Sequence, residues 1–233
     1  CLDLHRRDGK GRLRPELLSP AGGPEAGYAA LAHGADAVYL GLKSFSARAE
    51  AVNFTLEELD TLTAYAHALT PRRRVFVTVN TLVLDRELPE VVAALAAVRD
   101  LDVDAVIVQD LGVASIVRRH LPTLTLHAST QMAVHSRRGV EALARLGVCR
   151  VVAARELTLD ELRDLCGVAD VEIECFVHGA VCYAYSGLCL FSSHATGRSA
   201  NRGRCAYVCG GSFSSDTNGK AFSALPFAMK DLA

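Results

Sequence analysis

The stretch VEIECFVH, residues 171–178, alternates between two kinds of side chain. In an extended strand, the odd-numbered side chains share one face and the even-numbered ones share the other. The odd face holds Val171, Ile173, Cys175 and Val177, and the even face holds Glu172, Glu174, Phe176 and His178. A barrel of parallel strands buries one face of each strand under its helices and turns the other toward the lumen. The stretch therefore predicts a barrel strand with a polar inner face.

Earlier parts of the chain repeat this strand character. In TLHASTQ (125–131), polar and apolar positions alternate in the same way. Short apolar runs lie near residues 16–19, 37–41, 74–80, 105–109, 124–129, 149–154 and 171–177. Helical periodicity fills the intervals near residues 23–33, 55–69, 87–99, 111–120, 136–146 and 158–166. Strands that alternate with helices indicate successive βα units and a parallel sheet.

The spacing of the seven runs fits an α/β fold of the (β/α)8 TIM-like barrel type, or a doubly wound sheet. No G-x-G-x-x-G follows the first run, which counts against a dinucleotide-binding sheet. We therefore expect an incomplete barrel over residues 15–233, with seven strands present and the eighth missing. Residues 1–14 are polar and basic, and we expect them to form a flexible lead-in.

Composition and charge indicate a folded protein with no overall attraction to nucleic acid or membranes. Half of the 233 residues are hydrophobic and the net charge is −1, so the chain can bury a core and has no overall field that attracts nucleic acid. No apolar run approaches the length of a membrane span, and no signal-peptide pattern is present, so we expect a cytoplasmic protein. In that compartment, clustered cysteines more often indicate metal binding or catalysis than disulfides.

Several polar residues fall where the predicted strands end. If the fold is a barrel, these side chains line the mouth, the end of the barrel where active sites are built. They are Asn80, Gln109, Asp110, Gln131, Arg155, Glu156 and His178. The alternative is that each merely caps a loop.

Four of the eight cysteines, Cys182, Cys189, Cys205 and Cys209, lie close together in a Cys-rich loop (residues 179–220) after the seventh strand. Their C-x6-C-x15-C-x3-C spacing suits zinc poorly, because structural zinc sites usually have two tight pairs. Iron–sulfur clusters accept looser spacing, since each cysteine binds its own iron. We expect the other four cysteines to be small buried hydrophobic residues.

Arginines lie between the second and third of these cysteines, at positions 198, 202 and 204. They could be solvated, could offset the charge of a thiolate-ligated cluster, or could hold an anion. A guanidinium matches both a substrate carboxylate and an RNA phosphate.

Together these residues resemble peptidase family U-32, the collagenase-like proteins. The resemblance rests on ELLSPAG (16–22), GADAVYLGLKSFSARA (34–49), EIECFVHGAVCYAYSGLC (172–189) and GRSANRGRCAYVC (197–209). It extends from about residue 14 to the end. The most similar branch hydroxylates a cytidine of 23S ribosomal RNA, and another branch hydroxylates tRNA uridine.

The resemblance implies an oxygen-independent RNA hydroxylase that uses a 4Fe–4S cluster, with prephenate as the hydroxyl source. Cys182, Cys189, Cys205 and Cys209 would hold the cluster. From their places at the strand ends, we expect His178, Glu156, Asn80 and Gln131 to be the catalytic residues. His178 would either hold the loop by a hydrogen bond or transfer a proton to or from the substrate. Arg155, Arg198, Arg202 and Arg204 would bind a small dicarboxylate or an RNA phosphate.

Two departures from the family pattern bear on these expectations. Relatives often continue the last cysteine pair as C-A-Q-P-C-R, but here the sequence is C-A-Y-V-C-G (205–210). Relatives also go on to an eighth strand, so we expect a partner or a C-terminal part to complete the barrel. A peptidase and a metal-stabilised, non-enzymatic subunit, with zinc as the alternative metal, stay open. No H-E-x-x-H or G-x-S-x-G motif supports proteolysis.

Overall fold

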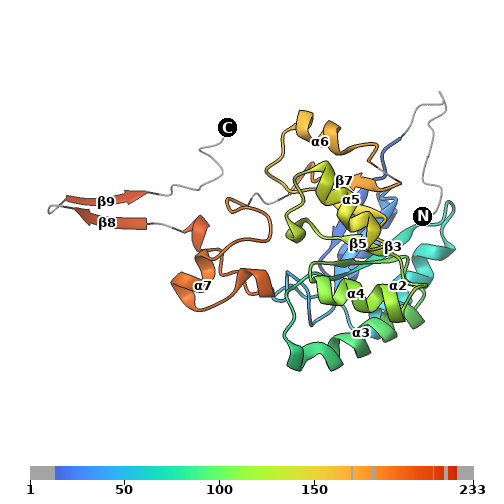
Figure 1. Cartoon of the computed structure of the whole chain (residues 1–233). Coiled ribbons are helices and arrows are strands. Elements are labelled where there is room, and N and C mark those ends of the chain that lie inside the picture. The colour runs from blue at the N-terminus through green and yellow to red at the C-terminus, as the bar shows by residue number, and fades with distance from the viewer. Residues whose placement is uncertain (1–13, 169, 180–181, 212, 218–219, 225–233) are drawn as a thin grey trace.

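Seven parallel strands form a curled, incomplete barrel in the computed structural model (Figure 1). The structure describes residues 14–168, 170–179, 182–211, 213–217 and 220–224, with only the backbone path in the last two ranges. The strands run in sequence order across the sheet. They are β1 (Leu18–Ala21), β2 (Ala37–Gly41), β3 (Arg74–Val79), β4 (Ala105–Val108), β5 (Leu126–Ala128), β6 (Arg150–Val152) and β7 (Glu172–Glu174). The predicted fold is confirmed, and the predicted lead-in lies outside the described residues apart from Arg14.

Six helices connect the strands at the predicted places. They are α1 (Pro24–Ala32), α2 (Leu56–Ala68), α3 (Leu88–Asp100), α4 (Leu111–His120), α5 (Arg137–Arg145) and α6 (Leu159–Leu165). Local sequence sets where they begin. At α2, the Thr55 hydroxyl accepts a hydrogen bond from the Glu58 N–H, and the Glu58 carboxylate accepts one from the Thr55 N–H. Thr158 and Glu161 repeat this capping box at α6.

The two faces of the sheet differ as the alternation predicts. Val75, Val77 and Val79 of β3 lie on the outer face, in the main core beneath the helices. Phe76 lies on the inner face and makes an edge-to-face contact with His127 of β5, with 4.9 Å between ring centroids. Burial and the charges of two arginines hold the pKa of His127 well below its usual value, so this imidazole is neutral.

The inner face is charged at the β6–β7 side. Arg150 of β6 is only 6% exposed, and its guanidinium pairs with Glu172 at 2.6 Å and with Glu16, just before β1, at 2.5 Å. Burial opposes the charged form of Arg150, but Glu16, Glu172 and Glu174 more than offset this and raise its pKa. Because these ion pairs join residues near the first and last strands, they hold the sheet in its curled shape.

Further elements follow β7. Helix α7 (Phe191–Thr196) and the 3-10 turns η3 (Ala200–Arg202) and η4 (Val208–Gly210) lie within the Cys-rich loop, which is therefore partly helical. An antiparallel hairpin of β8 (Phe213–Thr217) and β9 (Lys220–Ala224) projects away from the barrel (Figure 1). The sequence analysis did not predict this hairpin, whose first strand falls inside the range expected to be a loop. Within the described residues, we find no helix with the length and apolar character of a membrane span.

Candidate active site at the barrel mouth

The first half of the Cys-rich loop is anchored to the barrel by Ser186, which is fully buried. Its hydroxyl accepts hydrogen bonds from the backbone N–H and the Nε of Arg155, both at 3.1 Å. It also donates to the Glu156 carboxylate at 2.9 Å and lies 3.4 Å from the Thr130 hydroxyl. Glu156 in turn contacts His135 at 2.8 Å. This network ties the loop to the residues that follow β5 and β6.

Gly187 makes the closest approach in this anchor. Its φ of +71° lies in the left-handed region, and a Cβ at this position would stand 1.9 Å from the carbonyl oxygen of Gln131. Only glycine meets both conditions, so the segment between Cys182 and Cys189 is seated directly on the end of β5.

The second half of the loop is anchored on the other side of the mouth. Gly203, with a φ of +78°, lies so close to the Ser46 carbonyl that a Cβ would be 2.3 Å from its oxygen. The Arg202 guanidinium pairs with Glu87 at 2.5 Å and donates to the Leu82 carbonyl at 3.3 Å. The Cys-rich loop therefore rests on the segments that follow β2 and β3 as well as those that follow β5 and β6.

The four predicted ligand cysteines are free thiols, and Cys182, Cys189 and Cys205 lie near enough to Cys209 to act on it electrostatically. Burial raises the pKa of Cys209, and the charges of Cys182, Cys205 and Cys189 raise it further. In addition, the buried Ser192 hydroxyl donates to the Cys205 sulfur at 3.9 Å. Four thiols and a hydroxyl donor to one sulfur fit the donor chemistry of a metal cluster, since thiolate is the ligand that such clusters take.

The thiols are not drawn into ligand geometry. Among the described residues, no three His, Cys, Asp or Glu side chains are grouped closely enough to hold a metal ion. Outside the four, Cys166 and Cys175 are exposed and Cys149 is half-buried, so the expectation that these three are buried hydrophobic residues is wrong. Cys166 caps the end of α6, and Cys175 follows the edge strand β7, where little covers either side chain.

Residues 205–210, where the Cys-rich loop departs from the family pattern, make a separate contact with Arg48. Tyr207, which stands between the last two cysteines, has a φ of +52° and accepts a hydrogen bond from Arg48. The Arg48 guanidinium also lies over the Tyr207 ring, 5.4 Å from its centroid. This contact ties the last cysteine pair to the loop after β2.

The predicted catalytic residues surround the mouth but differ in what they do. Asn80 accepts a hydrogen bond from the Ala47 N–H at 2.8 Å and so holds the loop after β2. Gln131 lies in the short turn beneath the Cys-rich loop, and Glu156 holds Ser186. His178 is exposed, four residues before Cys182. Asn80, Gln131 and Glu156 each contact a loop at the mouth. The catalytic roles of all four residues stay predictions.

Of the two other polar residues predicted at the mouth, Asp110 has a structural role in the described contacts and Gln109 is buried. Asp110 caps α4, since its carboxylate accepts from the Gly112 N–H at 2.7 Å and the Val113 N–H at 3.1 Å. Gln109 is buried, with its Oε1 atom unpartnered among the described residues. For Asp110, the alternative of a loop or helix cap is the one observed.

Three of the four predicted substrate-binding arginines are engaged with the protein. Arg155, Arg198 and Arg202 contact Ser186, Glu50 and Glu87, respectively. Arg204 is exposed; its backbone N–H donates to the Ser199 carbonyl, and its guanidinium makes no ion pair or hydrogen bond within the described part of the chain. Substrate binding by this set stays a prediction.

A protein-family model matches most of this chain. The model described as Peptidase family U32 matches residues 22–233, which include β2 to β7 and the whole Cys-rich loop. The chain belongs to peptidase family U32. The resemblance noted in the sequence is thereby confirmed.

Curated relatives of this U32 chain include RNA-modifying proteins. It is 39% identical over 218 residues to the 23S rRNA 5-hydroxycytidine synthase of Escherichia coli, covering 94% of this chain and 30% of that protein. It is 39% identical over 198 residues to tRNA hydroxylation protein P of Escherichia coli, covering 84% and 43%. A collagenase of Porphyromonas gingivalis is 32% identical over 206 residues, covering 83% and 49%. The chain thus spans less than half the length of each of these relatives.

A solved structure supports the fold. The U32 peptidase Mk0906 aligns with a TM-score of 0.59 and 16% identity, covering 73% of this chain and 72% of that one. At this identity the likeness shows the shared fold alone.

Sequence reasoning about this U32 chain missed the residues that seat the Cys-rich loop. Ser186 and His135 carry no motif, because their role depends on segments far apart in the sequence. Gly187 and Gly203 were detectable in principle, since a glycine inside a ligand loop signals close backbone approach.

We expect replacement of Gly187 by alanine to unseat the first half of the loop. The left-handed backbone costs about 1–2 kcal/mol for a residue with a Cβ, and the contact with Gln131 adds roughly 1–3 kcal/mol of overpacking. Gly197→Ala is the matched control, because Gly197 has a φ of +70° and a Cβ added to it would meet no atom within 4 Å. Thermal unfolding should show a larger loss for Gly187→Ala. Equal losses would contradict the close approach.

Replacement of Glu156 by glutamine separates anchoring from catalysis. The carboxylate accepts from Ser186 and contacts His135, so the amide should weaken the anchor by about 1–2 kcal/mol. We expect a lower melting temperature and, if the four cysteines hold the predicted metal cluster, faster loss of that cluster. Unchanged stability and metal content together with lost activity would instead assign Glu156 the catalytic role.

Proposed function

We propose that this chain is the cluster-binding barrel of an oxygen-independent RNA hydroxylase. The observation that carries the proposal is the seating of a four-cysteine loop over the mouth of a U32 barrel. The names of two relatives, a 23S rRNA 5-hydroxycytidine synthase and a tRNA hydroxylation protein, support the same chemistry. An RNA substrate also favours a cytoplasmic protein.

Cys182, Cys189, Cys205 and Cys209 are the residues that would hold a 4Fe–4S cluster. When bound, such a cluster supplies redox or Lewis-acid chemistry that proteins lack in their own side chains. The protein's part is to fix the loop. Ser186 and Gly187 seat the first cysteine pair, and Gly203 and Tyr207 seat the second. Ser192 stabilises negative charge on the Cys205 sulfur by donating a hydrogen bond to it.

The substrate that we favour is a cytidine of 23S ribosomal RNA, with prephenate as the hydroxyl source. Support comes from the relative whose match covers 94% of this chain. Arg204 at the mouth is available to an anion, whereas Arg155, Arg198 and Arg202 act first by positioning the loop. Uridine hydroxylation in tRNA is the second candidate, favoured by the match to tRNA hydroxylation protein P.

The test begins with anaerobic purification and analysis of iron and acid-labile sulfide. The protein is then incubated with prephenate and with ribosomal RNA or tRNA that lacks the modification, and nucleosides are analysed by mass spectrometry. We expect bound iron and prephenate-dependent 5-hydroxycytidine in ribosomal RNA. 5-Hydroxyuridine in tRNA would select the second candidate.

Two results would overturn the proposal. Hydrolysis of gelatin without modification of either RNA would assign peptidase activity, as the name of the collagenase relative suggests for that protein. Zinc in place of iron, with neither activity, would indicate a metal-stabilised subunit.

A further inference from the structure

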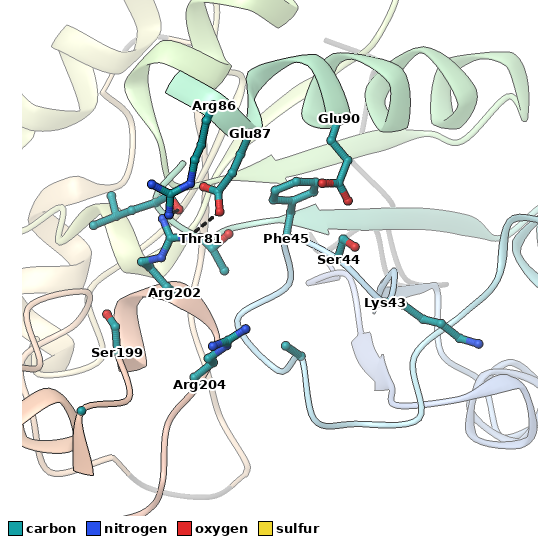
Figure 2. A pocket seen from close by; sticks show the side chains of 13 residues that line it. Lys43, Ser44, Phe45, Thr81, Arg86, Glu87, Glu90, Ser199, Arg202 and Arg204 are labelled. Carbon is teal, nitrogen blue, oxygen red and sulfur yellow. Dashed lines mark hydrogen bonds and ion pairs between the residues drawn. The ribbon is translucent and has the colours of Figure 1, made fainter. Parts of the chain in front are cut away.

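A pocket with a volume of about 480 Å³ opens beside the Cys-rich loop (Figure 2). Its walls come from three segments at the barrel mouth. Lys43 follows β2, Arg86 follows β3, and Arg202 and Arg204 belong to the Cys-rich loop. The pocket therefore exists only because the loop is seated on the ends of the strands.

The pocket carries an excess of positive charge. Four cations line it, against the two carboxylates of Glu87 and Glu90. Glu87 is already occupied, because it pairs with Arg202 at 2.5 Å and accepts from the Leu84 N–H at 2.8 Å. The hydrogen bond from Arg202 is the main reason that the pKa of Glu87 is lowered, so this carboxylate is ionised.

Three cations in the pocket have side chains that form no ion pair or hydrogen bond within the described part of the chain. They are Lys43, Arg86 and Arg204, and all three are exposed, although the charge of Arg86 also helps to lower the pKa of Glu87. Like charges gathered around one pocket repel each other unless an anion lies between them. Guanidinium groups match phosphate oxygens in geometry, and lysine adds a point charge.

The size and spread of the site favour an extended anion over a small one. A volume of about 480 Å³ lies in the range of pockets that hold drug-sized molecules, which is larger than a phosphate or a small dicarboxylate needs. Figure 2 shows Lys43 well apart from Arg86, Arg202 and Arg204, with its side chain directed away from the three arginines, which lie on the other side of the view. A ligand that meets all three free cations must carry negative charges at several points.

We propose that this pocket binds the sugar–phosphate backbone of a single RNA strand, with Lys43, Arg86 and Arg204 contacting successive phosphates. A strand held there continues past the Cys-rich loop into the mouth. This inference rests on the proposed RNA substrate, and it assigns Lys43 and Arg86 a role that the sequence did not suggest.

The test uses the triple variant K43Q/R86Q/R204Q and a fluorescent single-stranded RNA of about ten nucleotides. Fluorescence anisotropy measures the association constant over a series of salt concentrations. Each phosphate contact contributes about 0.7 to the slope of log K against log salt, so the slope should fall by about 2 in the triple variant. Affinity at about 0.1 M salt should fall at least tenfold. Each single variant should remove about one third of the change in slope.

Arg119→Gln is the control, because Arg119 lies near the carboxyl end of α4, at the opposite end of the barrel from the mouth. It should retain the wild-type slope. An unchanged slope in the triple variant would overturn the proposal. A second result would also overturn it. If calorimetry shows that malonate binds the wild type and not the triple variant, while both bind RNA equally, the pocket holds a small dicarboxylate.

Iron content and hydroxylation by the wild type are measured in parallel. If the wild type is active and the triple variant keeps the wild-type salt slope, the RNA pocket is refuted and the proposed function is unaffected. If the wild type has neither iron nor hydroxylation activity, but the triple variant has a reduced salt slope, the RNA pocket is supported and the proposed hydroxylase is refuted.

Discussion

Replacement of Cys209 by serine is expected to remove the bound iron and to reduce RNA hydroxylation to background. A thiolate is the ligand that iron–sulfur clusters require, and a serine hydroxyl stays protonated and binds iron weakly. Cys209 is the most informative position, because the charges of the other three cysteines all act on its pKa. The same loss is expected for Cys182→Ser, Cys189→Ser and Cys205→Ser.

Cys166→Ser and Cys175→Ser serve as controls, since both cysteines are exposed and lie outside the four-cysteine set. They should keep wild-type iron and activity. Iron and labile sulfide are measured on anaerobic protein, with circular dichroism to confirm folding. A folded Cys209→Ser protein with full iron content would refute the assignment of Cys209 as a cluster ligand.

Replacement of His178 by alanine is expected to lower hydroxylation by about 10²–10⁴-fold while leaving the iron content intact. This is the usual effect of removing a general acid or base, and histidine is the side chain that ordinarily titrates near neutral pH. His178 is exposed and follows β7, four residues before Cys182. The measurement is the single-turnover rate on RNA, with its dependence on pH.

His194→Ala is the matched control, because His194 is also exposed in the Cys-rich loop but lies on α7. It should retain activity. If His178→Ala loses its iron as well, His178 supports the loop and does not transfer a proton. A wild-type rate with an unchanged pH profile would exclude it from both roles.

Most of the barrel was predictable from local sequence patterns. The alternation in residues 125–131 and 171–178 predicted inner faces that the structure bears out with His127, Glu172 and Glu174. Such patterns are local, because burial of one face repeats every second residue along a strand. The caps at Thr55 and Thr158 were predictable for the same reason, since both partners lie within four residues.

The edge strand was predicted less well. The run at 171–177 predicted a longer strand than β7, which spans Glu172–Glu174. β7 pairs with β6 on one side only, so fewer backbone hydrogen bonds extend it. The α7 helix and the β8–β9 hairpin were missed, because the glycine- and serine-rich composition of that region indicates a loop.

The construction of the site depends on contacts between segments that are distant in the sequence. Sequence spacing identified four candidate ligand cysteines, but it did not show that Ser186 meets Glu156 or that Gly203 meets Ser46. Nor did it show that most of the candidate arginines pair within the protein, or that Lys43 and Arg86 join Arg204 around one pocket. These contacts join segments that lie 30 or more residues apart in the sequence. Side-chain periodicity reports the burial of each segment, whereas its partners depend on how the strands curl and bring their ends together.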